Sequence, residues 1–244
     1  MNRILLPFLL LLLTLSSCGR KYKIEGTSSV TSLDGKMLFL KALDHGEWVV
    51  IDSAEVVHGV FSMRGKADTI LMATLYLGDT NIMPLVLEKG SIRIHISNNE
   101  LSARGTKHND ALYDFIDKRD EMETRLYELD RKEARLIMDG GDWGTVRMQV
   151  VEETEKLVEE MNAYIKTFIS DNYETILGPS VFIMLCSSLP YPVLTPQIED
   201  ILQEAPPAFT NDFMVKEYVA KAEENMKLIN ESRRPDLNNL TAIP

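Results

Sequence analysis

Residues 92–116 read IRIHISNNELSARGTKHNDALYDFI, and the hydrophobic pattern changes within this stretch. The three isoleucines at its start alternate with polar residues, which predicts a strand with one buried and one solvated face. After Gly105, apolar residues such as Leu112 and Phe115 recur at helical spacing. The sequence therefore predicts an α+β fold in which an N-terminal β-domain ends near Gly105 and helices follow.

Short strands and tight turns are predicted from Tyr22 to about Arg104. The pairs Asp34-Gly35 and His58-Gly59 lie between apolar or alternating runs, and such pairs favour two-residue hairpin turns. Residues 37–40 and 70–72 are continuously apolar, which predicts strands that are covered on both faces. About eight strands result, and this number is typical of an antiparallel β-sandwich or a partly open barrel.

Helices are predicted over residues 106–229, and the tail over residues 230–244 is expected to fray. The two longest should form an antiparallel pair that is joined by Asp139 to Gly144, since glycine and aspartate disfavour helix continuation. Thr195-Pro196 has the pattern of an N-cap followed by proline at the first helical position. The predicted helices cover residues 109–138, a segment from about 145, 179–189, 196–204 and 210–228.

Residues 1–17 have the pattern of a lipoprotein signal peptide. Arg3 precedes a twelve-residue apolar core, Ile4 to Leu15, which is too short to span a bilayer. The sequence Leu15-Ser16-Ser17-Cys18 resembles a bacterial lipobox, in which the cysteine thiol receives the lipid. We therefore expect cleavage before Cys18, acylation with chains such as palmitate, and a β-domain over residues 18–105. An ordinary secretory signal with an incidental cysteine is the alternative.

The residues after Cys18 indicate the membrane face to which the lipoprotein is sorted. Gly19 to Lys23 contain no acidic residue. By analogy with known lipoprotein sorting, this favours the periplasmic face of the cell outer membrane over surface display.

The charge balance excludes one class of function. The chain has 26 Lys and Arg against 37 Asp and Glu, a net charge of −11, which argues against nucleic-acid binding. Residues 106–244 hold 27 of the acidic residues and 15 of the basic ones. Solvated helix faces explain this excess, and a docking surface for a basic partner is the alternative.

No catalytic site, metal site or cofactor is predicted. The histidines have none of the spacings that metal sites use, and they are expected in a turn (His58), on an exposed strand face (His95) and in loops (His45 and His108). Cys186 lies in an apolar run, which predicts an inert, buried thiol. Four carboxylates share one face of the first helix and are expected to be solvated: Asp110, Asp114, Asp117 and Glu121.

Several stretches, beginning with Lys23-Ile24-Glu25-Gly26, resemble a domain of unknown function that is common in lipoproteins of Bacteroidota-type bacteria. The resemblance implies a β-domain directly after a lipidated cysteine, followed by a helical spacer. It covers residues 22 to about 115 and rests on Ile51–Val56, Gly59-Val60-Phe61, Gly65, Pro84–Glu88, Gly90, Gly105-Thr106 and Asn109-Asp110.

The residues of this domain have structural interpretations of their own. Asp52-Ser53 is expected to close a turn, and Gly105-Thr106 to cap the first helix. A ligand role for Asp52 or Glu88 is the alternative.

In many proteins with this domain, the spacer leads into a thioredoxin-like domain with a Cys-x-x-Cys active site. This sequence has no such motif and ends at Pro244, so we expect it to correspond to their front half only. The resulting hypothesis is a non-enzymatic lipoprotein that acts as a binding or assembly module for an envelope partner. The alternatives are an accessory role in thiol-disulfide or peroxide metabolism, and a carrier of a small ligand.

Overall fold

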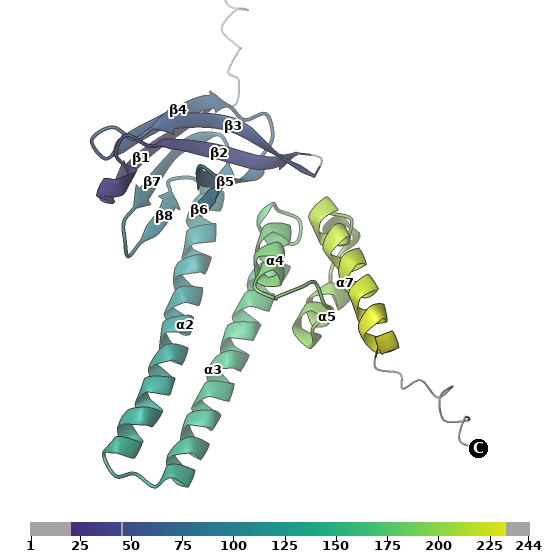
Figure 1. The fold of residues 1–244 in the computed structure, drawn as a ribbon. Helices are drawn as coiled ribbons and strands as arrows, with labels where there is room; N and C mark the ends of the chain where they lie inside the picture. Colours follow the sequence, from purple (N-terminus) through teal and green to yellow (C-terminus); the bar gives the residue numbers. More distant parts are fainter. Residues whose placement is uncertain (1–20, 45, 233–244) are drawn as a thin grey trace, which may run out of the picture. The chain divides into compact units, whose positions relative to one another are not determined.

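The protein forms two compact units, which meet within one long helix. The computed structural model describes residues 21–44 and 46–232, so Cys18 and His45 lie outside the described residues. The first unit extends to Asp114 and is called here the β unit; the second begins at Phe115 and is called the helical unit. Strands precede helices along the chain (Figure 1), which confirms the predicted α+β class.

The described part of the β unit contains two four-stranded open sheets. Sheet A has the order β4-β1-β7-β8, and sheet B has the order β3-β2-β5-β6. Neighbouring strands are antiparallel except for β1 and β7, which run parallel. A parallel pair needs a long connection, which β4 and the four strands of sheet B provide here. The strands are β1 (Lys21–Ser28), β2 (Met37–Asp44), β3 (Glu47–Glu55), β4 (Val60–Lys66), β5 (Leu71–Leu77), β6 (Thr80–Leu87), β7 (Gly90–Ile96) and β8 (Leu101–Arg104).

Alternating side chains from both sheets form the core of the β unit. Ile92, Ile94 and Ile96 are buried, as the sequence pattern predicted. The prediction that residues 37–40 are covered on both faces was wrong, because Leu38 and Leu40 are buried whereas Met37 is 41% exposed. Residue 70 also differs from the prediction, since it precedes β5 and is exposed.

The His58-Gly59 turn is confirmed. Both residues have positive φ, 53° and 72°, and Val57 and Val60 on either side of them form a β-bridge. Positive φ at both central residues matches the right-handed twist of the strands that such a turn connects.

Two aromatic residues cross directly over glycines on the neighbouring strand. In the β1–β4 register, Phe61 lies opposite Gly26 and Tyr22 lies opposite Gly65. A Cβ atom at Gly65 would lie 2.6 Å from the Tyr22 hydroxyl, and one at Gly26 would overlap the Phe61 ring. Both rings are buried, so the missing side chains make room for them in the core.

The helices follow the prediction with small shifts at their ends. The first of the short helices begins at Leu177, two residues before the predicted Pro179, and Pro207 starts a helical turn. The last helix includes residues 230–232, which were predicted to fray; residues 233–244 lie outside the described part of the chain. The helices are α2 (Lys107–Met138), α3 (Trp143–Asp171), α4 (Leu177–Ser187), α5 (Pro196–Gln203), α6 (Pro207–Thr210) and α7 (Phe213–Ser232), and a short 3-10 helix, η2 (Thr31–Leu33), precedes β2.

Helices α2 and α3 form the predicted antiparallel hairpin (Figure 1). Lys132 Nζ lies 2.7 Å from Glu153 Oε2, which fixes the register of the two helices near the loop that joins them. Nearer the start of the helical unit, the ring of Phe115 stacks on Tyr164 and contacts Phe168.

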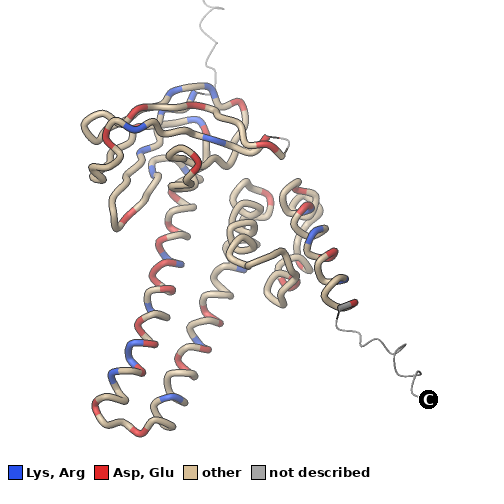
Figure 2. The backbone as a smooth tube through the Cα atoms, viewed as in Figure 1, with Lys and Arg blue, Asp and Glu red and all other residues tan. Residues whose placement is uncertain are grey.

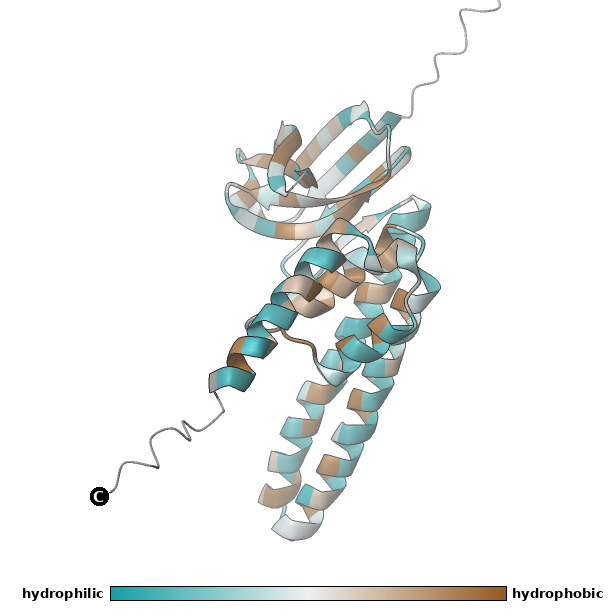
Figure 3. Ribbon diagram, turned by 90° about the vertical axis from the view of Figure 1, so that its right-hand side faces the viewer, coloured by the Kyte–Doolittle hydropathy of each residue, from teal (hydrophilic) through white to brown (hydrophobic). Residues whose placement is uncertain are grey.

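The shorter helices have their own apolar core. Phe182 contacts Phe209 edge to face, and both side chains are buried. Helices α2, α3 and α7 each contain both hydrophilic and hydrophobic residues along their length (Figure 3), as expected for helices with one buried and one solvated side. Thr195 caps α5 as predicted, by accepting a hydrogen bond from Ile198 N–H. None of the described helices is both long and apolar enough to cross a membrane.

Candidate functional site

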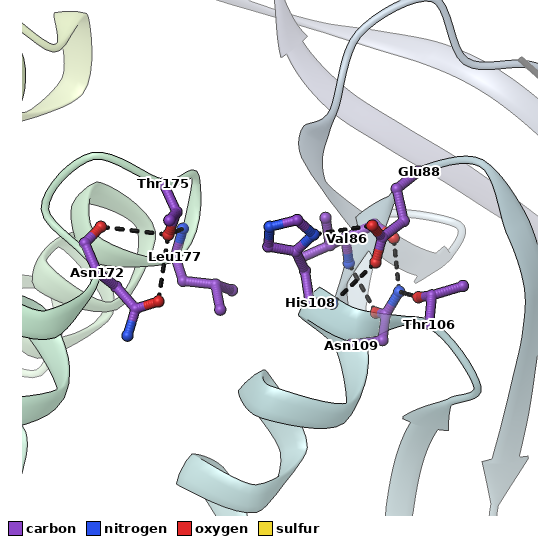
Figure 4. A network of polar contacts seen from close by, with 8 residues as sticks. All are labelled: Val86, Glu88, Thr106, His108, Asn109, Asn172, Thr175 and Leu177. Carbon is purple, nitrogen blue, oxygen red and sulfur yellow. Dashed lines mark hydrogen bonds and ion pairs between the residues drawn. The ribbon is translucent and has the colours of Figure 1, made fainter.

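The carboxylate of Glu88 lies at the start of α2. Glu88 follows β6 and is only 7% exposed. Its Oε1 accepts the backbone N–H of His108 at 3.0 Å, and its Oε2 lies 2.8 Å from Nδ1 of the His108 ring (Figure 4). The first N–H groups of a helix have no partner within the helix and carry partial positive charge. Glu88 therefore caps α2 from a residue twenty positions earlier in the chain.

The hydrogen bonds keep Glu88 ionised despite its burial. Burial by itself raises the pKa of this carboxyl group. Hydrogen bonds from the His108 ring, the Thr106 hydroxyl and the His108 N–H outweigh that effect, so the pKa lies below its usual value. The charge is consequently part of the folded structure at neutral pH.

Asn109 connects the same helix turn to strand β6. Its Oδ1 accepts the N–H of Val86 at 2.8 Å, and its Nδ2 donates to the C=O of Val86 at 2.7 Å. Nδ2 also donates to the Thr106 hydroxyl at 2.8 Å (Figure 4). Asn109 is completely buried, and both polar atoms of its side chain have partners. These contacts join Glu88, Thr106 and Asn109 in one buried network.

One helical turn further along, Tyr113 donates its hydroxyl hydrogen bond to the C=O of Pro84 at 2.8 Å. Four residues along a helix rise about 6 Å, and two residues along a strand rise about 6.8 Å. The pairs Asn109–Val86 and Tyr113–Pro84 therefore stay in register. In the described residues β6 pairs only with β5, so the first turns of α2 cover its other edge.

The predicted helix cap is in place, although it differs in detail. The C=O of Thr106 accepts the first helical hydrogen bond, from Asp110 N–H. The hydroxyl of Thr106 is bonded to Asn109 and Glu88, and the carboxylate of Glu88 takes the capping role. The capping role of Glu88 was not predicted, because Glu88 and His108 are twenty residues apart in the sequence.

Asp52 bridges the two sheets. It lies within β3, so the prediction that Asp52-Ser53 closes a turn was wrong. Its Oδ2 accepts the Tyr22 hydroxyl at 2.8 Å from β1 and the Arg64 N–H at 3.2 Å from β4. Burial, and then the hydrogen bond to Asp52, raises the pKa of Tyr22, so the phenol stays protonated. Asp52 thereby links β3 of sheet B to the free edge of β4 in sheet A.

A second polar network lies in the helical unit, between α3 and α4. The hydroxyl of Thr175 donates to the C=O of Asn172 at 3.2 Å and accepts the N–H of Leu177 at 3.2 Å (Figure 4). These contacts order the connection between the two helices.

Cys186 is buried on α4, as predicted. Burial raises the pKa of its thiol to about 12, with a smaller opposite effect of the Tyr218 hydroxyl. At neutral pH the group is a thiol, not a nucleophilic thiolate.

The three histidines in the described part of the chain do not come together. His58 is in a turn as predicted, His95 is half-buried on β7 beside the Thr27 hydroxyl, and His108 lies in the first turn of α2, so its predicted place in a loop was wrong. Within residues 21–44 and 46–232, no three His, Cys, Asp or Glu side chains are grouped as metal ligands.

The carboxylates that were predicted to be solvated on the first helix are exposed at Asp114, Asp117 and Glu121 and half-buried at Asp110. Asp110 accepts the N–H of Gly105 at 2.8 Å, and Asp114 pairs with Arg104. Glu121 pairs with Lys118 at 2.8 Å, and Asp117 also has an interaction. Ion pairs between exposed side chains contribute little to stability, so this face is mainly solvated, as predicted.

An exposed apolar surface lies on the edge strand β3. Trp48, Val49 and Val50, called here the β3 patch, are 54%, 38% and 57% exposed. The Trp48 ring contacts Tyr76 edge to face at 5.8 Å, and the ammonium group of Lys41 lies 4.5 Å from the centre of the Tyr76 ring. In the described residues β3 forms a ladder only with β2. Its second half approaches β4, where Asp52 accepts the Arg64 N–H, so the open part of the edge is the β3 patch. Open apolar edge strands are surfaces on which other chains dock.

A hollow of about 1110 Å³ lies between α2 and α3 in the helical unit. Charged side chains such as Arg125, Lys132, Glu153 and Glu160 form most of its walls. This lining does not suit the apolar ligand of a small-molecule carrier.

Comparison with known protein families gives a match over most of the β unit. Residues 22–112 match the model of the family described as Domain of unknown function (DUF4369). This domain is of unknown function. No curated protein and no solved structure gives a significant match to the chain. The matched segment ends within α2 and includes the contacts of Glu88 and Asn109, so the capped start of α2 is part of the matched domain.

Proposed function

We propose that this protein is a non-enzymatic lipoprotein of the cell envelope, anchored through Cys18 on the periplasmic face of the outer membrane. Its β unit serves as a binding or assembly module for another envelope component. The observation that carries the binding role is the β3 patch, where three consecutive apolar residues are exposed on an open strand edge.

The polar groups of the molecule support a non-enzymatic role. Glu88, Asp52 and Asn109 are engaged within the fold, and the Cys186 thiol is buried with a raised pKa. A catalytic acid or nucleophile needs access to a substrate, and burial denies that access to Glu88, Asn109 and Cys186.

The binding role is tested by crosslinking living cells, purifying the protein in mild detergent and identifying the proteins that accompany it. Trp48→Ala should lose the partner. Trp143→Ala is the matched control, because Trp143 is also exposed (59%) but lies in the helical unit. If the Trp48 variant retains every protein that the wild type retains, the β3 patch is not the binding surface.

The anchor is tested separately. Cys18→Ala should move the protein from the membrane fraction to the soluble fraction and abolish labelling with radioactive palmitate. Labelling that persists in this variant contradicts the anchor.

A further inference from the structure

The outer face of sheet A is rich in Lys and Arg. Lys21 and Lys23 on β1, Arg64 and Lys66 on β4, and Arg93 on β7 are called here the basic face (Figure 2). Each alternates with buried residues of its strand, which places all five side chains on the side away from the core. With Arg104 on β8, the strands of sheet A hold six of the ten Lys and Arg residues between positions 21 and 114.

The arrangement brings like charges together. Lys21 lies directly opposite Lys66, and Lys23 lies directly opposite Arg64 in the β1–β4 register. Like charges at such positions destabilise a sheet. Folding alone therefore does not favour this distribution, whereas binding of an anionic partner does.

Acidic residues do little to neutralise the face. Among the strand residues of sheet A, Glu25 is the acid on this side; it pairs with Lys23 and accepts a hydrogen bond from Ser91. Arg104 is excluded from the basic face because it pairs with Asp114 and bonds the C=O of Asp110. Five positive charges against one negative charge remain, in a chain of net charge −11.

The side chains also surround a shallow hollow. Lys21, Lys23, Arg64 and Lys66 line a space of about 490 Å³, with Gly65 among its walls. Several cationic groups around one depression suit phosphate groups, which carry their charge on projecting oxygens.

We propose that the basic face binds the anionic phospholipid headgroups of the membrane to which Cys18 is anchored. This inference rests on the proposed lipidation of Cys18, which would place the β unit at the membrane surface. Two residues lie between Cys18 and Lys21, and the three residue steps from one to the other reach at most about 11 Å. The potential of a charged bilayer decays over about 8 Å at physiological salt, so Lys21 and its neighbours lie within that field. The lipid holds the chain at the membrane, and the basic face orients the β unit on it.

The test uses the chain from Gly19 to Pro244, which lacks the lipid but keeps every residue that the structure describes. Binding is measured by sedimentation with vesicles of phosphatidylcholine alone, or of equal parts phosphatidylcholine and phosphatidylglycerol. Each is tested at about 0.01 M and about 1 M salt, where the Debye lengths are about 30 Å and about 3 Å. We expect binding to the anionic vesicles at low salt, and none at high salt or to the neutral vesicles.

Two variants with equal loss of charge locate the surface. Lys21→Gln/Arg64→Gln/Lys66→Gln removes three charges from the basic face, whereas Lys36→Gln/Lys107→Gln/Lys156→Gln removes three exposed lysines that lie outside sheet A. Each charge near a membrane changes the partition coefficient by roughly fivefold, so the first variant should bind about a hundredfold more weakly. The second should bind nearly as well as the wild type. Circular dichroism confirms that both variants are folded.

Equal weakening in both variants overturns the proposal, because it means that net charge alone decides binding. Absence of binding to anionic vesicles overturns it as well. Inhibition by free inorganic phosphate at millimolar concentration contradicts a membrane source and indicates a soluble phosphate ligand. Since this chain carries no lipid, these results are independent of palmitate labelling at Cys18, which tests the anchor.

Discussion

The side-chain amide of Asn109 pairs with both backbone groups of Val86, at 2.8 Å and 2.7 Å, and so takes the place of a neighbouring strand. The edge strand β6 is thereby closed by a helix. Glu88 and Thr106 extend this pairing into the cap of α2. The junction between sheet and helix depends on this small buried network, and two of the predictions below concern it.

Asn109→Ala should destabilise the β unit by about 2–4 kcal/mol, since it leaves the N–H and C=O of Val86 buried without partners. Urea unfolding followed by Trp48 fluorescence in a Trp143→Phe background reports on this unit. Asn98→Ala, in an exposed turn, is the matched control and should change stability little. Equal effects of the two substitutions would show that the pairing contributes nothing.

Glu88 makes the stability of the β unit dependent on pH. Its folded-state pKa is depressed below the usual value of 4.5, so the ionised group stabilises the fold above that value. This stability is lost as the pH falls through the folded-state pKa. Between about pH 5 and pH 3, the free energy of unfolding of the wild type should decrease more steeply than that of Glu88→Gln. Parallel pH profiles of the two proteins would contradict the assignment.

Gly26→Ala should destabilise the β1–β4 pair, because the new methyl group would overlap the buried Phe61 ring. Overpacking of this kind costs about 1–3 kcal/mol. The double variant Gly26→Ala/Phe61→Leu should recover part of the loss, because the smaller side chain leaves room for the methyl group. A double-mutant cycle in urea measures the coupling, and strictly additive effects would refute the close contact.

Cys186 should resist thiol reagents until the helical unit opens. In the chain from Gly19 onward it is the sole cysteine, and burial raises its pKa to about 12. Labelling with a chromogenic disulfide at neutral pH should be slow, and it should accelerate in urea along with the loss of helical circular dichroism. Rapid labelling in buffer, at the rate of a small free thiol, would be inconsistent with the buried position.

Local patterns in the sequence predicted much of the fold. The alternation from Ile92 to Ile96 predicted β7, and the helical spacing after Gly105 predicted α2. Thr195 and the His58-Gly59 turn were recognised from the chemistry of single residues. These features depend on neighbours within a few positions, which is why the sequence alone reveals them.

Features that depend on distant residues were missed or misinterpreted. The parallel pairing of β1 with β7 and the cap that Glu88 provides for α2 join segments that no local pattern connects. Asp52 was placed in a turn because aspartate favours turns, whereas here it bonds Tyr22 across the two sheets. The basic face became visible only once the strand register was known, since its five residues are spread from Lys21 to Arg93.

The two glycine–aromatic crossings set a rule for how this domain can diverge. Each pair occupies one fixed space between β1 and β4. A bulkier residue at Gly65 therefore fits only if a smaller side chain replaces Tyr22, and the same holds for Gly26 and Phe61. Single substitutions at these four positions should be selected against, whereas paired exchanges are permitted. Across a large set of sequences with this domain, positions 22 and 65, and positions 26 and 61, should therefore covary as two independent pairs.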